Sequence, residues 1–253
     1  MTVLFRLVLA AVAFVIFAGG PAPAEAGSTS GVEMTVGAGW GFTDQSDIND
    51  KYIDELAKPA GLLDDNLSHR ISFYGELGYV LPPRHVLCVG LSYMGGKSAK
   101  ESSSPIVDEN QNIIGSMTVS NELTTSAVIL HVRVKYFLWR KSRRPFVGLG
   151  LAYAFGEAES THETVVDSSG ATLWRSNDDY TGRGWGWFVT LGTKRDLTGP
   201  LAVGVEGGYR RLLTADLKDE AGEVWRFDGS SPAQAIRLDF SGWFVMGTLS
   251  VEL

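Results

Sequence analysis

The sequence predicts an all-β protein that folds as an eight-stranded, antiparallel, up-and-down transmembrane β-barrel with long external loops. Three observations support this prediction. Eight segments alternate large apolar residues with small or polar ones, which is the period of a strand with two different faces. Short and long connections alternate along the chain, as they do in barrels that cross a membrane. Beyond residue 26, no apolar run approaches the ~20 residues that a transmembrane helix needs.

The expected strand at residues 146–155 shows the pattern most clearly. Large apolar residues occupy every second position from Val147 to Phe155, and only glycine and alanine stand between them. A soluble sheet would place polar residues on its second face. Small residues there indicate the crowded interior of a narrow barrel, with the bulky face toward lipid.

The first four expected strands cover residues 32–43, 69–81, 86–95 and 117–139. The first alternates apolar residues with glycines. The second ends at two prolines, which cannot donate to a β-ladder, and the third starts after that tight turn. From Val128 to Leu138, the fourth carries apolar residues at its even positions, and His131, Arg133 and Lys135 are among the residues between them.

The last four expected strands cover residues 146–155, 184–194, 201–213 and 235–253. The sixth strand of the series has tryptophans on its apolar face, and the seventh alternates apolar residues with small and charged ones. In the eighth, the apolar parity changes between Phe240 and Trp243. We therefore expect a β-bulge near Ser241 and Gly242.

The connections after the second, fourth and sixth strands are short, and the others are long. We expect loops at residues 96–115 and 156–183, the latter with a hairpin around Gly170 that stands out of the membrane. Acidic residues gather in the long loops. Basic residues, including Lys194 and Arg195, are expected in the short turns. An even number of strands places both termini on the turn side.

The N-terminus has the features of a secretory signal peptide. Arg6 precedes an apolar run from Leu7 to Ala18, and small residues with Ala-x-Ala spacing follow it. We expect residues 1–26 to be cleaved, which leaves residues 27–253 as an outer-membrane barrel domain. The single cysteine, Cys88, excludes an intramolecular disulfide, and the net charge of −7 argues against nucleic acid as a partner.

Outward-facing aromatic residues gather toward the loop ends of the expected strands. Such residues form interfacial belts in contact with membrane lipid. The expected belt consists of Trp40, Phe42, Tyr93, Tyr153, Phe155, Trp185, Trp187 and Tyr209.

Charged residues at inward positions form the candidate site. They are Glu33, Glu76, His131, Arg133, Lys135, Glu206 and Arg210, with Arg237 and Asp239 as further candidates. Opposite charges in so narrow a lumen should pair, because an unpaired buried charge is costly. One interpretation is a salt-bridge plug, and the other is a narrow or gated polar passage that the inward glycines leave open.

The C-terminal run from Gly247 to Leu253 alternates apolar residues to its last position. Together with the strand count and the loop asymmetry, this run resembles the small eight-stranded outer-membrane barrels, the OmpA-, OmpX- and OmpW-like proteins. The resemblance implies outer-membrane localisation and insertion by the barrel assembly machinery, which recognises the C-terminal strand. Members of that family usually end in Phe or Trp, where this chain ends in Leu253.

Three functions follow from this reading. The first is a non-enzymatic barrel for envelope structure or surface interaction, with an external ligand of unknown kind at its loops. The second is a narrow porin-like or OmpW-like channel for small or hydrophobic molecules. The third is a barrel enzyme that acts on lipid, which the histidine positions disfavour, so we expect no enzyme activity and no catalytic residues. We expect no cofactor and no metal, because the acidic run after the first strand lacks EF-hand spacing.

Overall fold

The computed structural model describes residues 31–43, 45, 48–49, 67, 69–81, 84–109, 112–138, 143–166, 171–227 and 234–253. The expected signal peptide lies outside these residues, as does most of the acidic connection after the first strand. Among the described residues, no helix is both long and apolar enough to cross a membrane.

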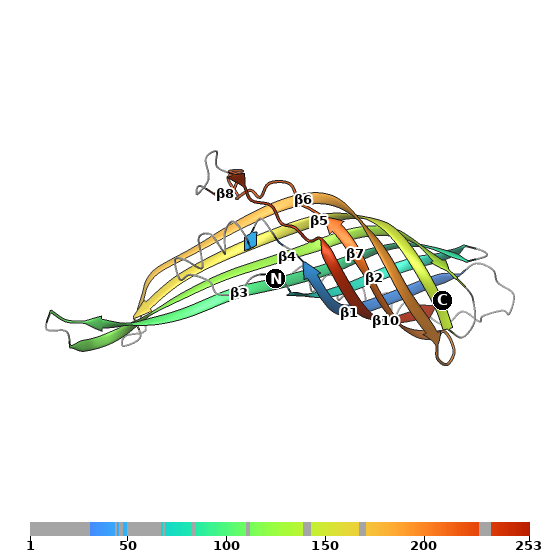
Figure 1. Ribbon diagram of the computed structural model, residues 1–253, viewed down its shortest axis with the longest axis horizontal. Coiled ribbons are helices and arrows are strands. Elements are labelled where there is room, and N and C mark those ends of the chain that lie inside the picture. The colour runs from blue at the N-terminus through green and yellow to red at the C-terminus, as the bar shows by residue number, and fades with distance from the viewer. Residues whose placement is uncertain are drawn as a thin grey trace.

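Eight antiparallel strands close into a barrel in the order β1-β10-β7-β6-β5-β4-β3-β2 (Figure 1). Each strand pairs with its neighbours along the chain, and β1 pairs with β10 to close the ring. The strands of the barrel are β1 (Val32–Thr43), β2 (His69–Leu81), β3 (His85–Val107), β4 (Ile113–Phe137), β5 (Arg143–Val166), β6 (Ala171–Asp196), β7 (Leu201–Leu212) and β10 (Gly242–Glu252). The predicted eight-stranded up-and-down architecture is therefore confirmed.

The strands fall into two length classes. β3, β4, β5 and β6 have 23 to 26 residues, whereas β1, β2, β7 and β10 have 11 to 13. A tilted strand needs about 9–11 residues to cross a bilayer. The four long strands therefore project beyond one end of the barrel by about 40 Å at the usual rise per residue. In Figure 1 the hairpins β3–β4 and β5–β6 extend well past the short strands.

The long strands correct the prediction of loops at residues 96–115 and 156–183. The β3–β4 ladder continues to Ile106, with a register shift before Val107, and the β5–β6 ladder continues to Val166 paired with Ala171. Beyond the membrane the outward positions change from apolar to polar residues, so the apolar alternation stops while the backbone hydrogen bonds continue. The described ladder reaches Val166 and Ala171, and the hairpin turn expected around Gly170 lies outside the described residues.

The last strand is shorter than predicted. β10 begins at Gly242, whose φ of 145° lies in a region that L side chains rarely adopt. Before it, β9 (Gln234–Ala235) pairs with β8 (Arg226–Phe227) in a separate two-stranded sheet. The change of parity near Gly242 marks the point where the chain enters the barrel wall, and no bulge within one strand is needed.

Two connections send apolar side chains into the barrel end that faces the long hairpins. We call this group the apolar plug, and it consists of Ile48, Leu67, Leu217, Ile236, Leu238 and Phe240. All six are at most 2 % exposed. They pack in one cluster with wall residues such as Met94, Leu123 and Leu212. The plug gives this end of the lumen a hydrophobic core of the kind found in soluble domains.

A second apolar cluster fills the lumen near the short turns. It contains Val86, Cys88, Phe137 and Phe146. Cys88 is fully buried and packs within this cluster. The charged residues of the candidate site lie between this cluster and the apolar plug.

Candidate functional site in the charged barrel interior

The structure places all seven expected interior residues inside the lumen, with at most 7 % of each exposed. They come from four strands, β1, β2, β4 and β7. Their strand parity is the one that the sequence indicates, because inward positions alternate with outward apolar positions.

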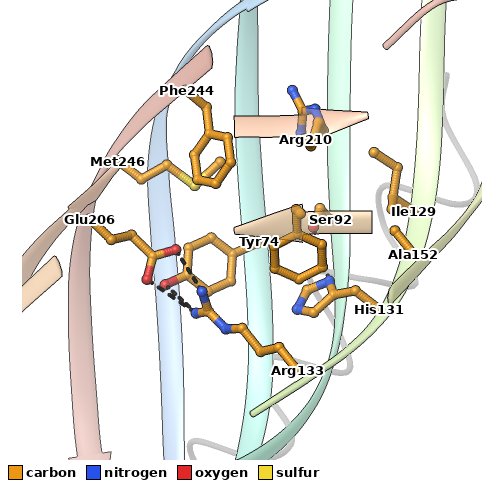
Figure 2. Close-up of a pocket in the computed structure, with 11 residues that line it drawn as sticks. Tyr74, Ser92, Ile129, His131, Arg133, Ala152, Glu206, Arg210, Phe244 and Met246 are labelled. Carbon is orange, nitrogen blue, oxygen red and sulfur yellow. Dashed lines mark hydrogen bonds and ion pairs between the residues drawn. The ribbon is translucent and has the colours of Figure 1, made fainter. Parts of the chain in front are cut away.

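Arg133 is the centre of the interior network. Its Nε donates to Glu76 Oε2 at 2.7 Å. Its Nη1 and Nη2 donate to the two carboxylate oxygens of Glu206, both at 3.1 Å, so this second pair is bidentate. Figure 2 shows the Arg133 guanidinium facing the Glu206 carboxylate. One side chain on β4 thus ties β2 and β7 together across the lumen.

The network continues toward the turns. Lys135 forms an ion pair with Glu76 and lies 3.9 Å from Glu33 Oε1. Glu33 Oε2 lies 2.5 Å from Lys194 Nζ. Charges therefore alternate along what we call the charged ladder, which consists of Lys194, Glu33, Lys135, Glu76, Arg133 and Glu206.

Lys194 corrects the sequence analysis, which placed it in a basic turn. It is 2 % exposed and points into the barrel. Its even number gives it the same parity as the inward residues Phe188 and Thr190 on β6. That parity was the signal in the sequence that could have located it.

His131 lies beside the ladder. Its Nδ1 is 3.2 Å from Ser92 Oγ, and its Nε2 is 3.6 Å from Glu76 Oε2. The rings of Phe188 and Tyr74 meet the imidazole edge-on, with centroids 5.7 and 6.3 Å away. These contacts hold the imidazole in one orientation.

Arg210 is set apart from the ladder. Its Nε donates to the Phe240 carbonyl at 2.8 Å, and its guanidinium lies over the Phe244 ring at 5.5 Å. Its Nη2 has no hydrogen-bond partner among the described residues. Arg210 therefore lies inside the lumen as expected, but it takes no part in the expected salt-bridge network.

A third buried arginine, Arg70, was not predicted. It donates to Thr43 Oγ1 at 3.0 Å and to the Thr125 carbonyl and hydroxyl at 3.1 and 2.5 Å, and it lies over the Phe240 ring at 5.1 Å. Arg70 shares its parity with the inward residues of β2, so its position was also readable from the sequence. The further candidates Arg237 and Asp239 lie outside the network: Arg237 is exposed and pairs with Asp216 at 2.8 Å.

A cavity of about 40 Å³ lies between the ladder and the apolar plug. Figure 2 shows the side chains that line it. They include Tyr74, Ser92, His131, Arg133, Glu206 and Arg210. A cavity of this size holds about one or two water molecules.

The outer surface has the opposite character. Leu149, Leu151 and Leu191 are each more than 60 % exposed, on strands whose inward faces carry the buried charges or pack against them. A protein with leucines outside and ion pairs inside is stable only where its exterior meets hydrocarbon. The chain is a small eight-stranded transmembrane β-barrel.

The expected belt residues lie on the outer face of the barrel. Trp185 is 73 % exposed and Trp40 is 64 % exposed. Rings contact one another from strand to strand, with centroids 4.6 Å apart for Tyr153 and Trp185 and 6.1 Å apart for Trp187 and Tyr209. Trp243, which the expected belt omitted, continues this row at 5.3 Å from Tyr209.

No protein-family model and no curated protein sequence matches the chain. Solved structures with a similar fold include Neisserial surface protein A, at 13% identity over 89% of this chain and 98% of that one, with a TM-score of 0.38. A major outer membrane protein from Thermus thermophilus matches at 13% identity over 88% and 99%, with a TM-score of 0.40. The outer membrane protease OmpT from Escherichia coli matches at 11% identity over 88% and 96%, with a TM-score of 0.37. Likeness at this level carries no information about function.

Proposed function

We propose that this protein is a non-enzymatic outer-membrane barrel with a closed lumen, which acts at the cell surface through its projecting hairpins. The observation that carries the proposal is the filling of the lumen along its length. The apolar plug occupies the hairpin end, the charged ladder crosses the middle, and the cluster around Phe137 and Phe146 fills the turn end.

Conduction through the lumen is the alternative function. A passage would have to break the bidentate contact between Arg133 and Glu206 and displace the apolar plug. Separating a buried ion pair leaves uncompensated charges, which costs several kcal/mol. The cavity beside the ladder holds only about one or two waters and does not amount to a pore.

An enzyme function has one feature in its favour. Ser92, His131 and Glu76 stand in the order of nucleophile, base and acid, at 3.2 and 3.6 Å. However, Glu76 is already bound by Arg133 and Lys135. The adjoining cavity is too small for a lipid or peptide substrate. We therefore assign this group to the structural network.

The projecting hairpins are the part of the barrel best suited to surface interaction. Their tips expose large apolar side chains, with Ile113 at 73 %, Ile114 at 63 %, Leu173 at 62 % and Trp174 at 54 %. Such side chains at the ends of otherwise polar strands offer a partner an apolar contact surface. The outward apolar face and the aromatic row contact membrane lipid, and β10 carries the C-terminal signal for the assembly machinery.

Two measurements test the proposal. Cysteines introduced by Thr172→Cys at a hairpin tip and Thr198→Cys in a short turn are probed on intact cells with a membrane-impermeant maleimide. Both sites are exposed, while the native Cys88 is fully buried and should give little background. We expect labelling at position 172 only, and labelling at position 198 after the outer membrane is permeabilised.

Planar-bilayer recording tests the closed lumen. We expect purified protein to give no current above the detergent background. Discrete conductance steps that are unchanged by hairpin truncation would favour the channel. Equal labelling of both cysteines on intact cells, or recovery of the protein without detergent, would contradict the outer-membrane placement itself.

A further inference from the structure

The buried charges of the barrel do not balance among the described residues. Within the described ranges, and leaving His131 aside, five buried side chains are cationic and three are acidic. The buried cations are Arg70, Arg133, Lys135, Lys194 and Arg210, and the buried acids are Glu33, Glu76 and Glu206. In the charged ladder, all three carboxylates already form ion pairs with Arg133, Lys135 or Lys194.

The surplus positive charge is located at Arg70 and Arg210. Arg70 is held by neutral threonine oxygens, and the Nε of Arg210 is held by a neutral carbonyl. Both arginines contact Phe240 of the apolar plug, one through its ring and the other through its carbonyl. Two like charges thus meet at one apolar residue, without a carboxylate partner among the described residues. A buried cation in such surroundings is strongly destabilising unless an anion compensates it.

Unpartnered donors accompany this charge. Arg210 Nη2 and Ser72 Oγ are both buried without a hydrogen-bond partner in the described part of the chain. Arg210 is 7 % exposed and Ser72 is 1 % exposed. A Cβ added at Gly41 would lie 3.0 Å from Arg210 Nη2 and 3.6 Å from Ser72 Oγ, so both donors border the space that the glycine leaves. Buried donors are nearly always satisfied in native proteins.

The geometry points to a binding site for a small inorganic monoanion of the halide class at the Arg210 guanidinium, between the apolar plug and the charged ladder. The cavity of about 40 Å³ that Arg210 lines supplies room for an occupant of water size. Ser72 does not line this cavity, but it supplies a neutral donor in the space beside Gly41 that Arg210 Nη2 also borders, and Arg70 adds positive potential. The lining also includes the Glu206 carboxylate, whose charge Arg133 neutralises. The site is too small for a carboxylate-bearing metabolite or a phosphorylated lipid headgroup, which selects a simple ion such as chloride.

The anion links the plug to the wall. Arg210 is anchored on β7, Ser72 on β2, and the Phe240 carbonyl belongs to the plug. An anion bound at the Arg210 guanidinium, which also donates to the Phe240 carbonyl, reduces the repulsion between Arg210 and Arg70 that opposes packing of the plug. Bound chloride should therefore stabilise the folded barrel, with a dependence on concentration set by mass action.

The test is thermal unfolding of the detergent-solubilised barrel in sodium chloride or sodium bromide, against sodium gluconate at equal ionic strength. Gluconate is too large for the cavity, so it controls for general screening. For the wild type we expect the unfolding midpoint to rise by about 4 °C over a hundredfold range of halide concentration. The same midpoint should not change with gluconate.

Two variants and one matched control locate the effect. We expect Arg210→Gln to abolish the halide dependence, and Ser72→Ala to weaken halide binding several-fold while leaving the arginine in place. Arg211→Gln changes the exposed neighbour of Arg210 and should keep the wild-type response. A crystal grown in bromide should show an anomalous peak within hydrogen-bonding distance of the Arg210 guanidinium.

Three results would overturn the inference. They are a midpoint independent of halide, an equal halide response in Arg210→Gln, and a bromide-grown crystal without an anomalous peak at Arg210. If Arg210→Gln does not fold, Ser72→Ala and the bromide crystal still decide the question. None of these results bears on labelling of the hairpin tips, so the proposed surface function is tested separately.

Discussion

Arg133 on β4 holds Glu206 on β7 through two parallel hydrogen bonds of 3.1 Å across the interior of the barrel. The strands β5 and β6 lie between β4 and β7 on one side of the ring, and β3, β2, β1 and β10 lie between them on the other, so no backbone ladder joins the two residues directly. The pair therefore acts as an internal cross-brace. Its position also explains how the narrow lumen accommodates charged side chains, because opposite charges satisfy one another where water has little room.

Removing a carboxylate from the brace should strongly destabilise the barrel. Glu76→Gln leaves Arg133 and Lys135 short of one buried negative charge, and we expect a loss of about 3–5 kcal/mol in the free energy of unfolding. Urea unfolding in detergent, followed by heat-modifiable mobility in SDS, measures this loss. The exposed pair Lys97–Glu122, with its 2.7 Å contact, provides the control. Lys97→Ala should cost at most about 1 kcal/mol. Equal costs for the two substitutions would show that the buried ladder does not brace the barrel.

Lys194 and Arg195 are neighbours on β6 with opposite environments, since Lys194 is buried and Arg195 is exposed. Lys194→Met removes the 2.5 Å partner of Glu33, and we expect a loss of about 3 kcal/mol. Arg195→Met should change stability by about 0.5 kcal/mol or less. The same unfolding experiment compares the two. If both variants lose equal stability, Lys194 belongs to a solvated turn, as the sequence alone suggested.

Gly242 and Gly247 allow a matched comparison within β10. A Cβ at Gly242 would collide with the Phe42 carbonyl, and the backbone there has a φ of 145°, so Gly242→Ala should cost about 2 kcal/mol or more. A Cβ at Gly247 has its nearest neighbour at 4.0 Å, so Gly247→Ala should be near neutral. The yield of SDS-resistant barrel after refolding reports both effects. A neutral Gly242→Ala would mean that the chain enters the barrel wall elsewhere.

The extended ladders of the long strands can be tested by amide hydrogen exchange. Residues 116–126 and 157–163 lie within paired segments of β4 and β5, so their amides should exchange slowly. Loops at these positions would exchange within seconds. The β8–β9 sheet has only two residue pairs and should exchange faster than the ladders. Rapid exchange throughout 157–163 would show that this segment is a loop, as the alternation of apolar residues indicated.

Apolar alternation predicted the ring of eight strands because it records contact with lipid on one face. It stopped at Gly95 and Phe155 because the outward residues become polar outside the bilayer, although the pairing of β3 with β4 and of β5 with β6 continues. The alternation of inward and outward positions along each strand predicted the seven interior residues. The same alternation, continued to the strand ends, also predicts Arg70 and Lys194 as interior residues.

The apolar plug could not be predicted from the local sequence pattern. Ile236, Leu238 and Phe240 alternate as a lipid-facing strand would, yet all three are fully buried inside the barrel. Apolar residues with a period of two indicate that one face of a strand is apolar, but they do not indicate whether that face contacts lipid or protein. Only the tertiary path of the chain before Gly242 decides between the two.

That path has a consequence for the order of assembly. The segment 236–240 is joined directly to β10, the strand that closes the seam with β1. It therefore reaches its place only when the final strand arrives at the seam. Until then the nascent sheet has an open interior, with Arg70 and Arg210 still accessible to water. We therefore expect closure of the seam and completion of the apolar plug to occur together, late in the biogenesis of this protein.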